Sequence, residues 1–389
     1  MATDFLHGPE VIEIDSGPRP IQVVRSSVIG LIGTAPDADA NQFPYDTPVL
    51  IAGSRKQAAG LDTKGSGEGT LPAAIDGIFD QVGAVVIVVR VPKGADDAAT
   101  RSKVIGGTTA QGENTGLKVF LEAQSELGFT PRLLCAPGFS HEKAVAVEME
   151  VVANRLRGTA IIDGPNSTDQ AAIDFVSNVS TRCYLVDPWV RVFNTKSSTE
   201  VVEAASARVA GLIARTDNEL GFWHSPSNKQ MFGILGAARP VDFVLGDKNC
   251  RANLLNEKHV ASIIRQDGFR LWGNRNCNTS DTKWMYLSVR RTADIINDSI
   301  LQAHMWATDR NITTTYLDDV TEGVNAFLRS LQAQGAILGG KCWADPDLNS
   351  PANIQLGQGW FNFDFTPPFP AEHVIFRSHL VNDYLEELV

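Results

Sequence analysis

Apolar and polar positions follow two periods through the first two thirds of the chain. Short β-branched or apolar runs predict buried strands at residues 28–32, 85–91, 132–135, 160–162 and 183–186. Apolar residues at helical spacing predict helices at 118–127, 142–157, 169–178 and 198–215. Strands that alternate with helices are typical of βαβ units around a mostly parallel sheet. Residues 28 to about 240 therefore predict an α/β fold.

From about Val260 the pattern is that of a compact α+β domain. Strands are predicted at 269–273 and 284–289, and a helix from Thr292 to about Thr308. A second helix is predicted from about Asp319 to Gln334, with the apolar positions Val320, Val324, Phe327, Leu328 and Leu331 at near-ideal spacing. Asp318 or Asp319 is expected to cap its start, and Gly335 suits its end.

Both ends of the chain have the pattern of extended arms. Near the N-terminus Ile12 and Ile14 alternate with acidic residues, and no hairpin partner lies nearby in the sequence. At the other end, residues 361–365 alternate strictly, a proline-rich turn follows at 366–370, and 372–381 predict a further strand. A strand without a local partner needs one from a distant segment or another chain. We expect intersubunit arm contacts at Val11, Ile12, Ile14, Ile21, Val23, Val374, Phe376 and Leu380.

Composition narrows the class of protein. The chain has 389 residues and a formal net charge of −11, which argues against nucleic-acid binding, because that needs clustered Lys and Arg on phosphates. No apolar run approaches the roughly 20 residues that cross a bilayer, and the first residues lack signal-peptide features, so membrane insertion and export are not expected. The five cysteines are scattered without a Cys-x-x-Cys pair and are expected to be reduced, with Cys135 and Cys183 in the core.

The α/β pattern invites an enzyme interpretation, but the sequence offers no motif for one. Gly30 and Gly33 do not form a dinucleotide-binding turn and are interpreted as packing or turn glycines. No Gly-x-Ser-x-Gly elbow occurs, and nothing local supports a triad of Asp163, His224 and Ser225. We therefore predict no catalytic residue, no metal ligand and no cofactor. A hydrolase-like α/β enzyme with an unrecognised site and a monomeric binding protein with disordered tails stay open as alternatives.

Several segments, in order along the chain, carry a family resemblance. They are His7-Gly8-Pro9-Glu10-Val11, the run from Val28 to Pro36, Ser225-Pro226-Ser227-Asn228-Lys229, Leu271-Trp272-Gly273-Asn274-Arg275 and Arg290-Arg291-Thr292-Ala293-Asp294. In this order they resemble the contractile tail sheath family of myophages, R-type bacteriocins and related injection machines. Asn276 departs from the family, whose members often carry threonine there.

The resemblance implies a fold and a domain plan. The expected fold has a subtilisin-like, non-catalytic α/β central domain and an α+β C-terminal domain, with extended N- and C-terminal arms. The expected bounds are 1–25 for the N-terminal arm, 26–258 for the α/β region, 259–365 for a tube-facing C-terminal domain, and 366–389 for the C-terminal arm.

The resemblance also implies a function and partners. The chain would be a structural sheath subunit in a helical stack of hexameric rings around an inner tube, and contraction would drive that tube through a target envelope. Its partners would be copies of itself, the inner tail tube protein, and the baseplate and tail terminator proteins, without nucleic acid or membrane insertion. It would assemble in the bacterial host cytoplasm and reside in the tail sheath of a virion or bacteriocin particle. Glu322, Asn325 and Arg329 are the expected tube-facing residues.

Overall fold

The computed structural model describes residues 21–382, and the chain divides into two units within them. The larger unit is Ser27–Arg291 with residues 369–382, and the smaller unit is Thr292–Pro368 with residues 21–26. The division after Arg291 differs from the expected boundary after Lys258, because the two strands that follow Lys258 complete the main sheet of the larger unit.

The larger unit is built on an eight-stranded sheet with the order β13-β12-β8-β7-β6-β1-β3-β2. Its strands are β1 (Ile29–Gly33), β2 (Pro48–Ala52), β3 (Val85–Arg90), β6 (Leu133–Cys135), β7 (Thr159–Asp163), β8 (Cys183–Val186), β12 (Val260–Arg265) and β13 (Phe269–Trp272). The six central strands run parallel, whereas β2 and β13 pair antiparallel at the two edges. The mostly parallel α/β sheet is confirmed, and so are all five strands predicted for it.

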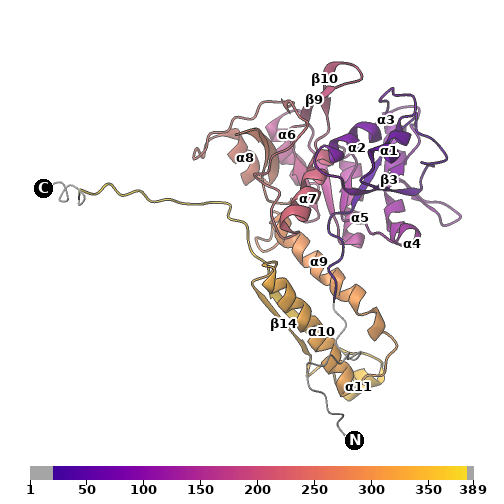
Figure 1. Ribbon diagram of the computed structural model, residues 1–389, viewed down its shortest axis with the longest axis vertical. Helices are drawn as coiled ribbons and strands as arrows, with labels where there is room; N and C mark the ends of the chain where they lie inside the picture. Colours follow the sequence, from indigo (N-terminus) through magenta and orange to yellow (C-terminus); the bar gives the residue numbers. More distant parts are fainter. Residues whose placement is uncertain (1–20, 383–389) are drawn as a thin grey trace, which may run out of the picture. The chain divides into compact units, whose positions relative to one another are not determined.

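Helices cover both faces of this sheet (Figure 1). In β1, Ile29 and Leu31 enter the core on one face, and Ile32 enters the core on the other. The first face packs against α2 (Leu71–Phe79) and α7 (Ser206–Leu220). The second packs against α3 (Asp97–Ile105), η2 (Gly116–Leu121), α4 (Ala123–Leu127), α5 (Lys143–Leu156) and α6 (Asp169–Val176). Burial on both faces explains why these strands are continuously apolar in sequence.

The two glycines of β1 are packing residues, as predicted. A Cβ on Gly30 would lie 2.8 Å from the Leu134 side chain and 3.0 Å from Phe120. A Cβ on Gly33 would collide with the Thr70 hydroxyl at the start of α2. Both positions therefore let helices approach the sheet closely, and neither forms part of a phosphate-binding turn.

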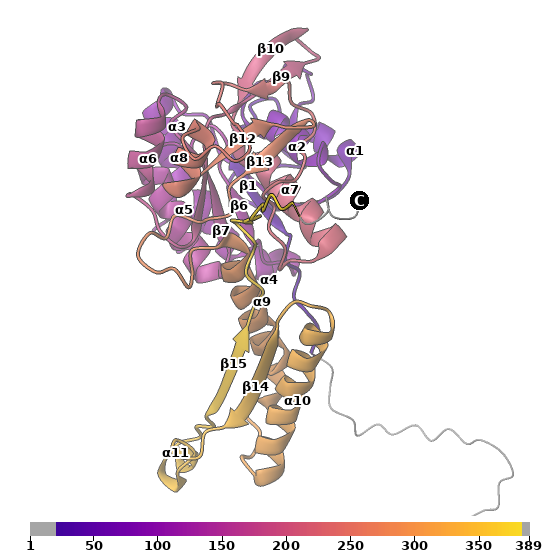
Figure 2. The same cartoon turned by 90° about the vertical axis from the view of Figure 1, so that its left-hand side faces the viewer.

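Shorter elements complete the larger unit. They are α1 (Arg55–Ala58), η1 (Ala59–Leu61), β4 (Gly107–Thr108), β5 (Asn114–Thr115), β9 (Val190–Asn194), β10 (Thr199–Glu203), β11 (Gly236–Ala237) and α8 (Arg251–Glu257). The helix predicted at 198–215 was wrong in its first part, because residues 199–203 pair with β9 as a strand and α7 begins only at Ser206. Figure 2 shows the β9–β10 hairpin standing out from the body of this unit.

Ion pairs fix the irregular segment that precedes α8. The Asp169 carboxylate, at the start of α6, accepts hydrogen bonds from Arg251 at 2.7 and 2.9 Å and from Arg239 at 2.9 Å. The bonds from Arg251, with those from Arg239, lower the pKa of Asp169 to about 2. The carboxylate thus stays ionised and holds this segment against α6.

The smaller unit pairs two strands and packs a long helix on them (Figure 2). Its elements are most of α9 (Leu287–Ala303), η3 (Met305–Ala307), α10 (Thr314–Ala333), β14 (Gly339–Ala344), α11 (Pro351–Gln355) and β15 (Phe361–Thr366). The strand predicted at 284–289 was wrong, because α9 already begins at Leu287. Thr313, and neither Asp318 nor Asp319, caps α10, accepting a 3.1 Å bond from the Tyr316 amide.

All five cysteine side chains are buried, and Cys135 and Cys183 lie in the core as predicted. Within residues 21–382, no helix is both long and apolar enough to cross a bilayer.

Candidate assembly interface

Asp163, the one member of the candidate triad that ends a central strand, has a structural role. Its carboxylate accepts hydrogen bonds from the Ser140 hydroxyl at 2.8 Å, the Ser206 hydroxyl at 2.6 Å and the Ser206 amide at 2.8 Å. The side chain is fully buried, and that burial raises the pKa of Asp163. The bonds tie the end of β7 to the first residue of α7, and neither His224 nor Ser225 is among the described partners of this carboxylate.

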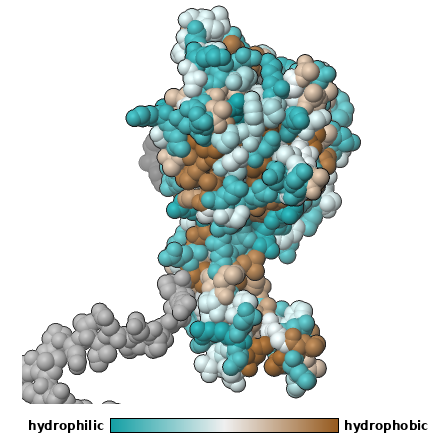
Figure 3. Space-filling view, turned by 90° about the vertical axis from the view of Figure 1, so that its right-hand side faces the viewer, coloured by the Kyte–Doolittle hydropathy of each residue, from teal (hydrophilic) through white to brown (hydrophobic). Residues whose placement is uncertain are grey.

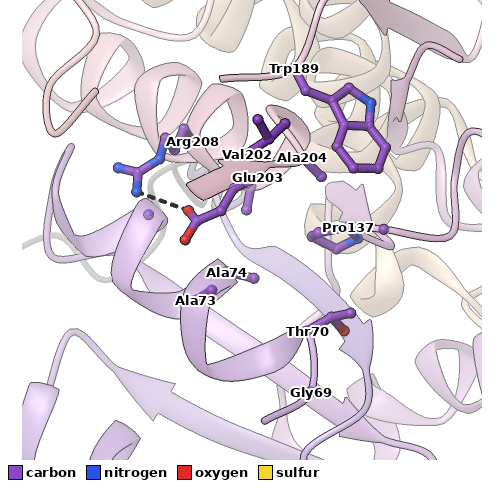
Figure 4. Close-up of a pocket in the computed structure, with 13 residues that line it drawn as sticks. Gly69, Thr70, Ala73, Ala74, Pro137, Trp189, Val202, Glu203, Ala204 and Arg208 are labelled. Atoms are coloured by element: carbon purple, nitrogen blue, oxygen red, sulfur yellow. Dashed lines mark hydrogen bonds and ion pairs between the residues drawn. The ribbon is translucent and has the colours of Figure 1, made fainter. Parts of the chain in front are cut away.

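A small hollow lies between α2, α7 and the residues that follow the central strands, where α/β enzymes hold their ligands. It has a volume of about 210 Å³, and Thr70, Pro137, Trp189, Glu203 and Arg208 are among its lining residues (Figure 4). Arg208 donates to Glu203 at 3.2 Å and to Asp80 at 2.7 Å. The Arg208 guanidinium at this hollow thus pairs with two carboxylates, and the residues form no pair of nucleophile and base.

The described part of the chain holds no cluster of three or more His, Cys, Asp or Glu side chains placed to bind a metal ion.

The C-terminal segment exposes the apolar residues predicted to make arm contacts. The exposed fraction is 61% for Val374, 92% for Phe376 and 99% for Leu380. Residues 369–382 pair with no strand of the described chain, so the strand predicted at 372–381 is not formed among residues 21–382 (Figure 1). Several large apolar side chains in water along one extended segment are typical of a surface that another molecule covers.

Only part of the N-terminal arm belongs to the described residues. Val11, Ile12 and Ile14 lie outside them. Ile21 is half-buried and Val23 is 38% exposed, and neither belongs to a strand. The next residue, Val24, donates its amide to the Ser299 hydroxyl at 3.1 Å, which attaches this end of the chain to α9.

The smaller unit offers an open strand edge that the sequence did not reveal. β15 pairs with β14 over six residues and with no other strand of the described chain. The outer edge of β14 is partly covered, because the Asn325 amide of α10 bonds both the amide of Cys342, at 2.8 Å, and its carbonyl, at 3.0 Å. A two-stranded sheet is only marginally stable alone, and an unpaired edge can accept a further strand. The outer edge of β15 is therefore the candidate acceptor.

The three residues expected to face the tube do not share one surface. Glu322 and Arg329 form an exposed ion pair at 2.5 Å, with about 60% of each side chain exposed. Asn325 is half-buried and turns towards β14. Its amide thus contributes to the packing of α10 on β14, and the tube-facing role of Glu322, Asn325 and Arg329 stays a prediction.

Apolar side chains also reach the surface elsewhere in the smaller unit. Leu338, Trp343 and Trp360 beside the strands are 64%, 36% and 43% exposed. Figure 3 shows, on one face of the chain, brown apolar patches between polar ones. Exposed apolar segments, an open strand edge and internally satisfied charges are together the features of a structural subunit that associates with others.

Comparisons with known proteins agree with this class. Residues 87–277 match the model of the phage tail sheath protein central domain, and residues 279–380 match that of the phage tail sheath C-terminal domain. The chain is 46% identical over 387 residues to a putative prophage major tail sheath protein of Pseudomonas aeruginosa, covering 99% of both chains. It is 36% identical to the tail sheath protein of Escherichia phage P2, covering 100% of this chain and 98% of that one.

Solved structures show the same fold at lower identity. The contracted helical sheath of the anti-feeding prophage matches with a TM-score of 0.73 at 19% identity, over 96% of this chain and 99% of that one. The contracted PVC sheath of an extracellular contractile injection system matches with a TM-score of 0.71 at 17% identity, over 99% and 100%. The chain belongs to the contractile phage tail sheath family. It is a structural, non-enzymatic tail sheath subunit, a component of a phage tail or related injection particle.

Proposed function

We propose that this chain polymerises into a helical stack of hexameric rings around an inner tube, and that the stack contracts to drive the tube through a target envelope. The observation that carries the proposal is the C-terminal segment, whose apolar residues are exposed and pair with no strand among residues 21–382. A segment of this kind, repeated head to tail between copies, generates a helical assembly rather than a closed dimer.

The terminal arms would link the copies by adding strands to neighbouring sheets. The 17 residues after Glu372 reach at most roughly 55–60 Å when extended, which is enough to enter a neighbour. On the open edge of β15 such a segment would make about five or six ladder hydrogen bonds, each contributing about 1 kcal/mol net. Burying Val374 or Phe376 would add roughly 1.5–3 kcal/mol each. Links of this strength persist while whole subunits move, so the sheath could contract without dissociating.

The further partners follow from the same role. They are the inner tail tube protein and the baseplate and tail terminator proteins. The chain would assemble in the bacterial host cytoplasm and then reside in the tail sheath of a virion or bacteriocin particle. The similar solved chains come from contracted sheaths and from a baseplate complex, which supports these partners. The net charge of −11 supports the exclusion of nucleic acid, and the parallel sheet is compatible with a non-catalytic, subtilisin-like origin.

Electron microscopy of the purified chain tests the proposal. We expect tubes or stacked rings, with assembly that depends steeply on protein concentration because each subunit adds to several others. Discrete monomeric particles at every concentration would contradict the proposal and would favour the alternatives of an enzyme or a monomeric binding protein.

We further propose that the exposed face of α10 around Glu322 and Arg329 contacts the tube. Both side chains are exposed. Their ion pair contributes only about 0–1 kcal/mol, so either side chain could exchange its partner for one on the tube. Charge reversal in Arg329→Glu should lower cosedimentation with purified tubes about tenfold, because it removes the cation of the proposed contact and sets a second carboxylate beside Glu322. Lys248→Glu, an exposed reversal in the larger unit, is the matched control and should bind normally. Unchanged tube binding by Arg329→Glu would exclude this face.

A further inference from the structure

The C-terminal segment is held to the larger unit at Glu372. Arg275 donates two parallel hydrogen bonds to its carboxylate, from Nε to Oε1 at 2.7 Å and from Nη2 to Oε2 at 2.5 Å. The Tyr286 hydroxyl donates to Oε2 at 3.4 Å. The Arg275 and Glu372 side chains are 25% and 31% exposed, and the bond to Glu372 raises the pKa of Arg275. Two-pronged bonding of this type fixes orientation as well as distance.

A ring contact also holds the C-terminal segment at Phe369, three residues before Glu372. The Phe369 and Tyr286 rings pack edge to face with their centroids 6.0 Å apart. After Glu372 the chain changes character, because every residue from His373 to Asn382 is exposed and none belongs to a helix or strand. Glu372 is thus the last held residue of the described C-terminal segment.

The residues that hold Glu372 are themselves rigidly placed. Arg275 and Tyr286 face each other in an antiparallel bridge, and the Asn276 amide donates to the Met285 carbonyl at 2.7 Å. The fully buried Asn276 side chain donates to the Trp284 carbonyl at 2.7 Å, which closes the loop from 276 to 284. The loop is therefore a fixed platform, and Arg275 projects from a defined backbone.

We infer that Arg275, Tyr286 and Glu372 form an anchor that sets where the free C-terminal arm begins and in which direction it leaves its subunit. We call these three residues the arm anchor. The inference rests on the proposed exchange of arms between subunits. With the anchor intact, the free arm begins at His373. Without it, the free length increases and the exit direction varies, which lowers the effective concentration of the arm at its acceptor edge.

Charge exchange across the anchor tests the inference. Arg275→Glu and Glu372→Arg should each raise the protein concentration needed for assembly about tenfold, because each places like charges in contact. The double variant with both exchanges restores an ion pair and should assemble within about twofold of the natural chain. Lys93→Glu, which breaks an exposed pair with Glu68 at 2.9 Å, is the matched control and should assemble normally.

Two results would overturn the inference, and one would instead reject the proposed arm exchange. Normal assembly of both single variants would show that the anchor is dispensable, and failure of the double variant to recover would show that the charge pair is not the reason for the defect. A variant without residues 373–389 distinguishes failure of the anchor inference from failure of the proposed arm exchange. Normal assembly of that variant would reject arm exchange itself, whereas its failure beside normal single variants would reject only the anchor. Thermal unfolding of each variant confirms that the larger unit is folded.

Discussion

Removal of residues 1–20 is expected to abolish long sheaths while leaving the larger unit folded. The described core of that unit begins at Val28, so the deletion leaves all of these buried residues in place. The deletion does remove the alternating stretch around Ile12 and Ile14, which has no hairpin partner nearby in the sequence. In a helical lattice every subunit would lose one link, and the loss would multiply along the tube. Sedimentation and electron microscopy should show the assembled fraction fall to background, with an unchanged unfolding temperature.

A finer change separates strand pairing from mere chain length. Ile12→Glu with Ile14→Glu places charges on the apolar face, and each buried isoleucine would otherwise contribute roughly 1.5–3 kcal/mol. Glu13→Gln with Asp15→Asn alters the opposite face of the same stretch and is the matched control. We expect the first variant to behave like the deletion and the second to form normal tubes. Tubes of normal length from the deletion itself would refute the role of this arm.

The central sheet could be predicted from sequence because its strands are buried on both faces. β1, β3, β6, β7 and β8 are runs of apolar residues, which few other elements produce. β10 was missed because it is an edge strand with exposed positions and no such run, whereas the edge strand β2 was missed although its residues are apolar. The strand at 269–273 was predicted, but β12 was not, and a change of sequence texture does not reveal that both join the main sheet.

Helix starts were less predictable than helix faces. The apolar stripe of α10 is strong from Val320 onward, yet the helix begins at Thr314, where Thr313 supplies the cap. The first turn packs only the half-buried Tyr316 and Leu317, so the stripe there is weak. Helical spacing also placed Asn325 on the same helix face as Glu322 and Arg329. Spacing cannot show that β14 packs against the Asn325 side of that face.

Only those features of the proposed interface that lie within a few consecutive residues could be predicted from the sequence. Alternating apolar residues without a hairpin partner indicated arms, because such a pattern is visible in a few consecutive residues. The acceptor edge of β15 depends on how β14, α10 and β15 meet, and the arm anchor joins residues 97 positions apart. Contacts of this range carry no local signal. The motif that includes Arg275 was recognisable by resemblance, but its partner became evident only in the folded chain.

Replacing Arg291 by leucine is expected to lower the free energy of unfolding by about 3–5 kcal/mol, the usual result of removing one partner of a buried ion pair. Arg291 donates two hydrogen bonds to the Asp217 carboxylate of α7, at 2.9 and 2.6 Å. The side chains are only 4% and 2% exposed, so water cannot replace the lost bonds. The variant would leave the Asp217 charge inside the protein without its two-pronged partner. Urea unfolding at concentrations below assembly measures the difference.

The matched control is Arg329→Leu, which also breaks an arginine–carboxylate pair, but one with about 60% of each side chain exposed. Its expected cost is below about 1 kcal/mol, because water solvates the remaining Glu322 charge. The double variant Arg291→Leu with Asp217→Leu should recover most of the stability lost by Arg291→Leu, since it removes the stranded charge together with its partner. Equal stability of Arg291→Leu and Arg329→Leu would show that burial does not strengthen this pair. The expected contrast comes from burial, since both arginines have the same chemistry and each faces a carboxylate.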